Sequence, residues 1–436
     1  MARLPYERQA GMLTAMDDSW KKALEAVGVC VPRILLPRNG TDLKKWAVIA
    51  CDQHTSEPEY WNEADRIVGE APSTLRLIYP EVYLDEQNPS HRIARIHHTM
   101  QEYLQTVLED LGETIILTKR STTRVRERTG MVLALDLEHY DYRPGAHSLI
   151  RATEQTIVER IPPRVRIRTG APLELPHVLV LIDDPANRLF SGLGSGAAQL
   201  LYDTDLMLDG GHVSGYRLSD PEHRHVAAVL PTLLSESQAD PPFLFAVGDG
   251  NHSLATAKAV WDGMRATAAA DHPARYALVE VVNLYDPGLR FEAIHRLVRC
   301  LDPEALVRDC AAVLEGTTEP CRTQELPAKL DGRGRGVGLI TRSGSRIVDV
   351  PGGDLPVAAV QAYLDRIEDA EVDYIHGWST VARLGSQDNT VGIVLPDFDP
   401  GLLYPTVSRR GVLPRKAFSL GEASEKRYYL EARRIS

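Results

Sequence analysis

Residues 243–253 read Phe243-Leu244-Phe245-Ala246-Val247-Gly248-Asp249-Gly250-Asn251-His252-Ser253, an apolar run that passes directly into a polar turn. The apolar run predicts a buried strand. Apolar residues then recur at spacings of three and four over 254–264, which predicts a helix across 252–266 that packs on a sheet. This stretch decides a fold in which a buried strand enters a helix through a tight turn.

Continuous apolar runs also occur at 177–182 and 277–282, and strands of this kind suit a sheet that is covered on both faces. Helical spacing predicts helices at 20–27, from Pro58, and at 91–111, 151–160, 303–314 and 355–367. Further strands are expected at 34–36, 114–118, 130–137, 337–341 and 346–350. Together these elements predict a mixed α/β (α+β) fold.

At 436 residues the chain is too long for one ordinary core. We therefore expect three parts: an N-terminal α+β domain at 1–145, a core with the Asp-Gly-Asn-His-Ser turn at 146–300, and a C-terminal α+β region at 301–436. No internal repeat and no low-complexity linker marks the boundaries.

Composition narrows the classes of function. The net charge of −11 repels nucleic acid, so no nucleic-acid partner is expected. No apolar run approaches the roughly 20 residues that cross a bilayer, and the N-terminus lacks a signal-peptide pattern. The five cysteines have no CxxC spacing, which fits a reducing compartment. We expect a cytoplasmic protein with no membrane partner and leave a homo-oligomer open.

The turn has the features of an anion site. Gly248 and Gly250 permit backbone angles that side chains forbid, and Asn251 is the predicted N-cap of the helix. The first N–H groups of a helix lack partners within it and lie at the positive end of its dipole, so they bind phosphate readily. His252 and Ser253 could each donate a hydrogen bond to a phosphate oxygen.

Asp249 is unexpected at such a turn, because a carboxylate beside a phosphate should repel it. A magnesium ion bound by Asp249, or a substrate hydroxyl that must lose its proton, would resolve the conflict. The alternative is a purely structural strand-to-helix turn in which Asp249 is a second cap. Both interpretations stay open at this point.

Other motifs favour structural roles. The glycine-rich stretch at 191–196 is better explained as a loop than as a dinucleotide site, and no P-loop motif occurs. Asp183 and Asp184 resemble strand-end caps, and Cys51 resembles a small buried cysteine more than a nucleophile. Basic residues at 408–416 are best explained as a solvated surface, although they could serve a small phosphate.

Three stretches resemble one family: Trp46 to Gln53, Asp249 to Thr256, and Leu413 to Lys416. They are similar to the family of proteins of unknown function DUF1015, a name that carries no activity. A more distant resemblance is to the ParB/sulfiredoxin-like fold, which includes free serine kinases and carries a strand–Asp-Gly-His-His-Arg–helix element that binds nucleotide phosphates. This resemblance implies a central mixed sheet with helices, flanked by N-terminal and C-terminal α+β parts.

Ser253 stands where that element has its arginine, so a bidentate phosphate ligand is absent from the turn. The candidates to replace it are Lys258, Arg409, Arg415 and Lys416. In serine kinases of this fold a glutamate near a helix start precedes a strand and then the Asp-Gly turn. By that resemblance Glu154 is the candidate general base, the alternative being a first-turn acid favoured by the helix dipole.

The resemblance implies a magnesium- and nucleotide-dependent kinase that phosphorylates a hydroxyl of a small metabolite, with serine as one candidate acceptor. Glu154, Asp249 and His252 would be its catalytic residues, and ATP or ADP its nucleotide. The rival hypothesis is a regulatory or interaction module that binds nucleotide without turning over a small molecule.

Overall fold

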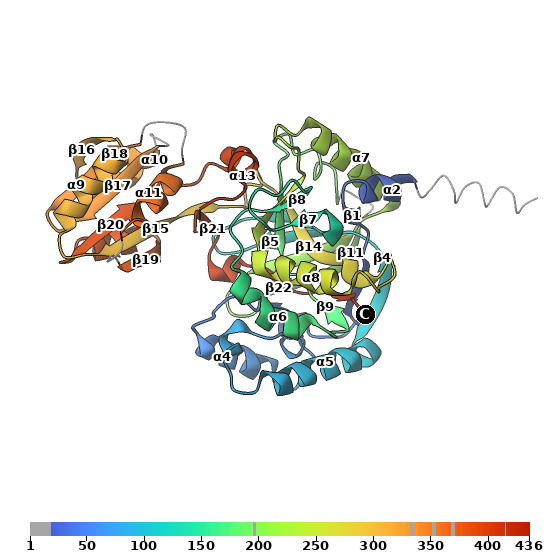
Figure 1. Cartoon of the computed structure of the whole chain (residues 1–436). Helices are drawn as coiled ribbons and strands as arrows, with labels where there is room; N and C mark the ends of the chain where they lie inside the picture. The colour runs from blue at the N-terminus through green and yellow to red at the C-terminus, as the bar shows by residue number, and fades with distance from the viewer. Residues whose placement is uncertain (1–18, 195–197, 332–334, 351–354, 368–370, 415) are drawn as a thin grey trace, which may run out of the picture. The chain divides into compact units, whose positions relative to one another are not determined.

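The computed structural model describes residues 19–194, 198–331, 335–350, 355–367, 371–414 and 416–436 (Figure 1). The chain divides into two compact units. The first contains the residues up to Leu289 together with Val407–Gly411 and Glu422–Ser436, and the second contains Arg290–Thr406 and Val412–Gly421. The C-terminal end of the chain thus belongs to the first unit.

The first unit is built on a ten-stranded sheet in the order β11-β12-β5-β6-β14-β10-β13-β8-β7, with β1 paired to β6. Pairing is parallel between β10 and β14, β13 and β8, and β8 and β7, and otherwise antiparallel. The predicted mixed α/β class with a central mixed sheet is confirmed. The strands are β1 Val29–Cys30, β5 Ile116–Ser121, β6 Arg128–Asp136, β7 Tyr140–Asp141, β8 Ile150–Ala152, β10 Leu179–Ile182, β11 Gln199–Asp205, β12 His212–Arg217, β13 Phe245–Asp249 and β14 Tyr276–Asn283.

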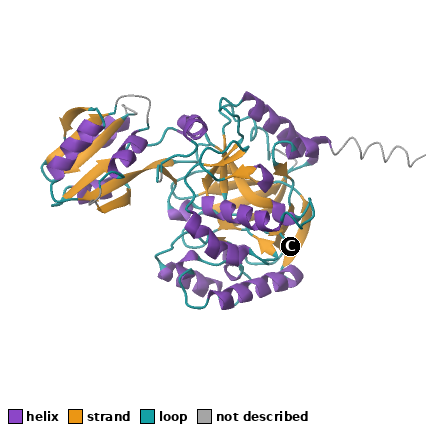
Figure 2. Ribbon diagram, viewed as in Figure 1, coloured by secondary structure: helices purple, strands orange, loops and turns teal. Residues whose placement is uncertain are grey.

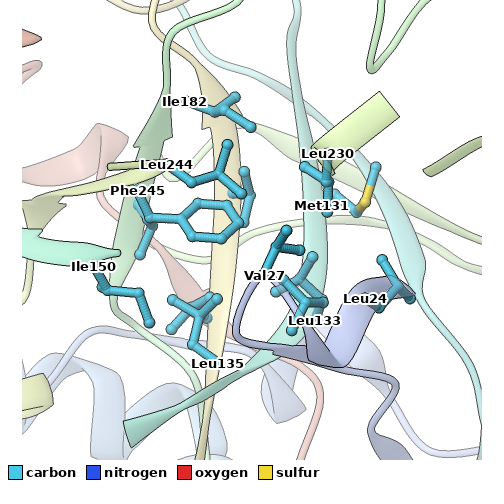
Figure 3. Close-up of a cluster of buried hydrophobic side chains, with 14 of the residues drawn as sticks. Leu24, Val27, Met131, Leu133, Leu135, Ile150, Ile182, Leu230, Leu244 and Phe245 are labelled. Carbon is cyan, nitrogen blue, oxygen red and sulfur yellow. The ribbon is translucent and has the colours of Figure 1, made fainter. Parts of the chain in front are cut away.

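Both faces of this sheet are covered, as the continuous apolar strands predicted (Figure 2). Successive strand residues point to opposite faces, so Ile115 and Leu117 join one core while Ile116 joins the other. The first core includes side chains from three helices: α2 Ser19–Glu25, α7 Asp220–Glu236 and α8 Asn251–Met264 (Figure 3). The second core includes side chains from α4 Pro58–Val68 and α5 Pro89–Thr106.

Three two-stranded ladders complete the first unit. They join β2 Arg33–Pro37 to β4 Leu108–Glu113, β3 Val48–Ile49 to β22 Tyr428–Tyr429, and β9 Leu173–Glu174 to β23 Arg433–Arg434. Two short helices are α3 Leu43–Trp46 and α6 Ile161–Arg168, and α6 packs beside α8 (Figure 1). The last residues of the chain therefore return to its N-terminal half.

The second unit has its own seven-stranded antiparallel sheet in the order β16-β18-β17-β20-β15-β19, with β21 paired to β15. Its strands are β15 Phe291–Arg299, β16 Thr317–Cys321, β17 Gly336–Thr341, β18 Gly344–Asp349, β19 Glu371–His376, β20 Thr390–Val394 and β21 Phe418–Leu420. Its helices include α9 Pro303–Val313, α10 Leu326–Asp331, α11 Pro356–Leu364 and α12 Trp378–Gly385.

Three expectations differ from the structure. The helix predicted at 151–160 is wrong, because Ile150–Ala152 pairs with β13 as strand β8 and only Val158–Arg160 forms a 3-10 turn. The helix predicted at 91–111 ends at Thr106, since Leu108–Glu113 pairs with β2. The parts expected at 1–145 and 146–300 share one sheet, so they form a single unit.

Candidate functional site

The polar turn lies between β13 and α8, as the sequence predicted. Gly250 occupies the N-cap position in the left-handed region with φ of 78°, and the Leu254 N–H donates to its carbonyl at 3.0 Å. A Cβ at Gly250 would lie 3.0 Å from the Cα of Val178, so glycine is required here for both angle and space. The prediction of Asn251 as N-cap is wrong by one residue, because the left-handed glycine takes that place and no side chain caps the helix.

Asp249 is paired with a lysine that sequence reasoning missed. The Nζ atom of Lys426 lies 3.0 Å from Oδ2 of Asp249, and the Gly250 N–H donates to Oδ1 at 3.0 Å. Burial raises the pKa of Asp249, but Lys426, the Gly250 N–H and His177 outweigh it and lower that pKa below its ordinary value. The carboxylate is therefore ionised and neutralised by a cation of the chain itself.

Asp249 as a magnesium ligand stays a prediction; in the structure its Oδ2 pairs with Lys426 and its Oδ1 accepts a hydrogen bond from the Gly250 N–H. Within the part of the chain that the structure describes, no three His, Cys, Asp or Glu side chains gather as a metal-binding group. Lys426 neutralises the Asp249 carboxylate, and this removes the repulsion expected between Asp249 and a phosphate bound at the turn.

The segment that follows β3 packs beside the turn. A hydrogen bond of 2.9 Å joins the Tyr429 hydroxyl to Nδ1 of His177, and the Cys51 N–H donates to the same hydroxyl at 3.1 Å. Nε2 of His177 lies 3.8 Å from Oδ2 of Asp52. Burial raises the pKa of the Cys51 thiol far above its ordinary value, which supports a structural cysteine.

His252 is a neutral side chain at the start of α8. Its Nε2 accepts a hydrogen bond from the Ile157 N–H at 3.2 Å, so the ring proton is on Nδ1. Burial, together with the charges of Arg164 and Arg160, lowers the pKa of His252 to about 4, although Asp52 opposes this effect. A neutral imidazole can still donate from Nδ1 to a phosphate oxygen, which keeps the predicted role available.

Glu154 lies near the turn, but not at a helix start as expected. It follows β8, which pairs in parallel with β13 so that Ala152 is opposite Val247. The Thr153 hydroxyl donates to the Val247 carbonyl at 2.6 Å and ties the two strand ends together. Asp249 is the last residue of β13 and Glu154 lies two residues after β8, so both lie at the carboxyl ends of adjacent parallel strands, where open α/β sheets commonly bind ligands.

Two buried oxygens near the turn have no hydrogen-bond partner among the described residues: Oδ1 of Asn251 and Oγ1 of Thr156. Asn251 is the first residue of α8, and Thr156 immediately precedes the residue whose N–H donates to His252. Buried polar atoms are rarely left without a partner, so these two are candidate contacts for a ligand.

The basic residues proposed to replace the missing arginine are distributed differently. Ser253 is half-buried in the first turn of α8, and Lys258 pairs with Asp262 at 3.1 Å. Lys416 belongs to the second unit, where its carbonyl accepts a hydrogen bond from Arg296 at 3.1 Å. Arg415 lies outside the described residues, as do Ser195 and Gly196 of the glycine-rich stretch. The cation found beside the turn is Lys426, and no local motif marks that residue in the sequence.

No described helix is both long and apolar enough to span a bilayer. The fold defines a mixed α/β protein whose polar turn lies at the carboxyl end of β13, an interior strand of a ten-stranded sheet. The chain belongs to the family described as "Protein of unknown function (DUF1015)", which it matches over residues 35–365. The expected family membership is confirmed.

No curated protein matches the chain. Among solved structures, a conserved hypothetical protein from Pyrococcus furiosus is 12% identical with a TM-score of 0.34, covering 70% of this chain and 95% of its own. A free serine kinase in complex with AMP is 11% identical with a TM-score of 0.36, covering 69% and 87%. SbnI with a C-terminal truncation, from Staphylococcus aureus, is 13% identical with a TM-score of 0.35, covering 66% and 84%. Scores of this size do not establish a shared mechanism, so function must be argued from the residues of this chain.

Proposed function

We propose that this protein binds a nucleotide at the N-terminus of α8 and transfers its terminal phosphoryl group to a hydroxyl of a small metabolite. The observation that carries the proposal is the uncapped start of α8 beside the Asp249–Lys426 pair. Each part of the proposed site supplies one requirement of phosphoryl transfer, which depends mainly on positioning and charge neutralisation.

The nucleotide phosphates would bind to the first turn of α8. The N–H groups of residues 251–253 precede the first hydrogen bond within the helix, which runs from Leu254 to Gly250. Donors of this kind, with the helix dipole behind them, bind phosphate without further cations. Nδ1–H of His252 would add one hydrogen bond, and Oδ1 of Asn251 would accept one from a hydroxyl of the ligand.

Lys426 would supply the positive charge that Ser253 cannot. Its side chain is 14% exposed and is held by Asp249 at 3.0 Å. A phosphate arriving at the helix would therefore meet a paired carboxylate and an ammonium group, not an isolated negative charge. Arg160 and Arg164 add to the positive potential, since both lower the pKa of His252.

Glu154 would be the general base. In this step the carboxylate of Glu154 takes the proton of the acceptor hydroxyl, whose oxygen forms a bond to the terminal phosphorus as the bridging P–O bond to the departing nucleotide breaks. The position of Glu154 two residues after β8, beside Asp249 at the end of β13, supports this assignment. Magnesium would enter with the nucleotide phosphates, and no step is assigned to a metal ligand of the chain.

Transfer from radiolabelled ATP or ADP to a panel of serine, threonine and small polyols, with and without magnesium, tests the proposal. Calorimetry with the same nucleotides measures binding separately. Labelled phosphate in an acceptor supports a kinase, whereas nucleotide binding without transfer to any acceptor favours the regulatory module. Absence of both binding and transfer rejects the proposal.

Substitution of Glu154 sharpens this test. Glu154→Gln should lower the transfer rate by about 10²–10⁴-fold while nucleotide affinity is unchanged, because a general base acts on the acceptor. The matched control is Glu159→Gln, an exposed glutamate five residues on that should leave transfer intact. Full activity of Glu154→Gln would show that another group is the base.

A further inference from the structure

A pair of buried arginines lies on the strands β5 and β6, apart from the proposed phosphoryl-transfer residues. Arg120 and Arg128 are directly opposite each other in the antiparallel register and are 5% and 8% exposed. Opposite residues of such a ladder have Cβ atoms about 5 Å apart, and like charges in this position destabilise the sheet. A buried pair of equal charges therefore needs a compensating group.

Arg120 has no carboxylate of the described chain within ion-pair distance. One terminal nitrogen donates to the Ser424 carbonyl at 3.1 Å, and the guanidinium lies 5.0 Å from the centre of the Tyr428 ring. Its Nε is buried and has no hydrogen-bond partner in the part of the chain that the structure describes. Burial and the charge of Arg128 lower the pKa of Arg120 to about 10, so the side chain remains charged at neutral pH.

Arg128 is only partly compensated. A terminal nitrogen lies 3.9 Å from Oε2 of Glu280, and its Nε is also buried without a partner. Glu280 already accepts hydrogen bonds from Arg427 at 2.7 Å and from Thr118 at 2.8 Å. The Glu280 carboxylate is thus shared between Arg427 and Arg128, and Arg120 has no carboxylate partner among the described residues.

The nearest acid along the chain does not fill this gap. Glu425 follows Ser424, but its Oε1 accepts from the Thr122 hydroxyl at 3.0 Å and its Oε2 accepts from the Glu422 N–H at 2.8 Å. Two unpartnered Nε–H donors, on two buried cations that face each other, match the hydrogen bonds that a carboxylate or phosphate accepts from arginine.

We propose that Arg120 and Arg128 bind a small oxyanion, the carboxylate of an organic acid or a phosphate. This proposal does not depend on the phosphoryl-transfer reaction.

Titration of the full chain with sodium phosphate and with sodium acetate, against sodium chloride of equal ionic strength, tests the site. We expect the arginine-dependent part of the binding, counted as the difference between wild type and Arg120→Gln, to be one anion per chain, and we expect it to raise the unfolding temperature. Arg120→Gln and Arg128→Gln should each weaken that binding at least about tenfold, the loss expected for one charge-assisted hydrogen bond. Arg126→Gln is the matched control, because Arg126 is exposed in the same hairpin and should bind as the wild type does.

Two further variants keep the test decisive. If Arg128→Gln does not fold, Arg128→Lys takes its place in the test. Lysine retains a cation near Glu280 but has no Nε–H donor, so this variant should also bind the anion more weakly. His252→Ala separates this site from α8, since it should leave the arginine-dependent binding unchanged. Tighter binding of phosphate than of acetate identifies a phosphate ligand, and the reverse order identifies a carboxylate.

The proposal is overturned if neither anion binds the wild type, or if binding survives at full strength in both arginine variants. Stability without added anion gives an independent readout. Arg120→Gln should then unfold at or above the wild-type temperature, because it removes a buried like-charge contact. A lower unfolding temperature together with unchanged anion binding would mean that Arg120 is structural.

Discussion

Arg427 holds the C-terminal segment on the sheet, and its replacement by methionine should strongly destabilise the first unit. It donates to Glu280 at 2.7 Å and to Glu431 at 2.6 Å, and all three side chains are buried. Methionine fills similar volume but leaves two carboxylates without their cation. Removing one partner of a buried ion pair typically costs about 3–5 kcal/mol.

The pKa of Glu280 gives a second estimate of that cost. Burial raises this pKa, but Arg427 above all, then Arg128 and Thr118, outweigh burial and lower it from 4.5 to about 2. The difference corresponds to about 3 kcal/mol of stability, present above pH 4.5 and lost as the pH falls towards 2. In the variant Arg427 no longer lowers the pKa of Glu280, so the variant loses less stability than the wild type as the pH falls below 4.5.

Urea unfolding from about pH 7 to about pH 3, followed by tryptophan fluorescence, measures this effect. Four of the five tryptophans belong to the first unit, so the signal reports chiefly on it. We expect a difference of at least about 3 kcal/mol in the free energy of unfolding between wild type and Arg427→Met near pH 7, and we expect it to narrow as the pH falls from 4.5 towards 2. Arg434→Met, an exposed arginine of β23, should stay within about 0.5 kcal/mol. A gap below about 1 kcal/mol, or one that does not change with pH, would refute this reasoning.

Three further predictions concern the turn. Gly250→Ala should destabilise the protein by about 1–2 kcal/mol in urea unfolding, because residue 250 has a φ of 78°. Gly263→Ala, in the open part of α8, is the control and should not destabilise it. Equal losses of stability in the two variants would contradict a strained turn at Gly250. Lys426→Met should weaken nucleotide binding, measured by calorimetry, about tenfold or more. Adding Asp249→Asn to this variant should restore part of the lost affinity, because it removes the carboxylate that Lys426 neutralises. Unchanged nucleotide affinity in Lys426→Met would show that Lys426 does not contact the nucleotide. His252→Ala should weaken nucleotide binding by a factor that stays constant from about pH 8 to about pH 5.5, because the pKa of His252 is about 4 and the ring stays neutral over this range. A factor that grows as the pH falls through about 6.5 would indicate that His252 has the ordinary pKa of a histidine.

The sequence was sufficient to predict the strand–turn–helix element and most of the buried strands. These features are local: apolar continuity in β13, period-3.6 spacing in α8 and a glycine where the backbone turns left-handed. The same local reasoning placed Glu154 in a helix. It failed there because the pairing of β8 with β13 joins residues far apart in the chain and overrides local helical spacing.

The composition of the site was only partly predictable. Asp249, Gly250 and His252 are adjacent in sequence, so one motif identifies them together. Lys426 and Tyr429 reach the turn because β22 pairs with β3, a long-range contact that no spacing rule reveals. Magnesium was expected at Asp249 because no positively charged partner for this carboxylate is apparent in the sequence. In the structure Asp249 has such a partner, Lys426.

A crystal structure of the full chain soaked with ATP and magnesium tests the central claim most directly. The account predicts phosphate density at the N–H groups of residues 251–253, with Nδ1 of His252 and Nζ of Lys426 within hydrogen-bond distance of phosphate oxygens. Nucleotide bound elsewhere on the chain, with the start of α8 contacting only water, would contradict it.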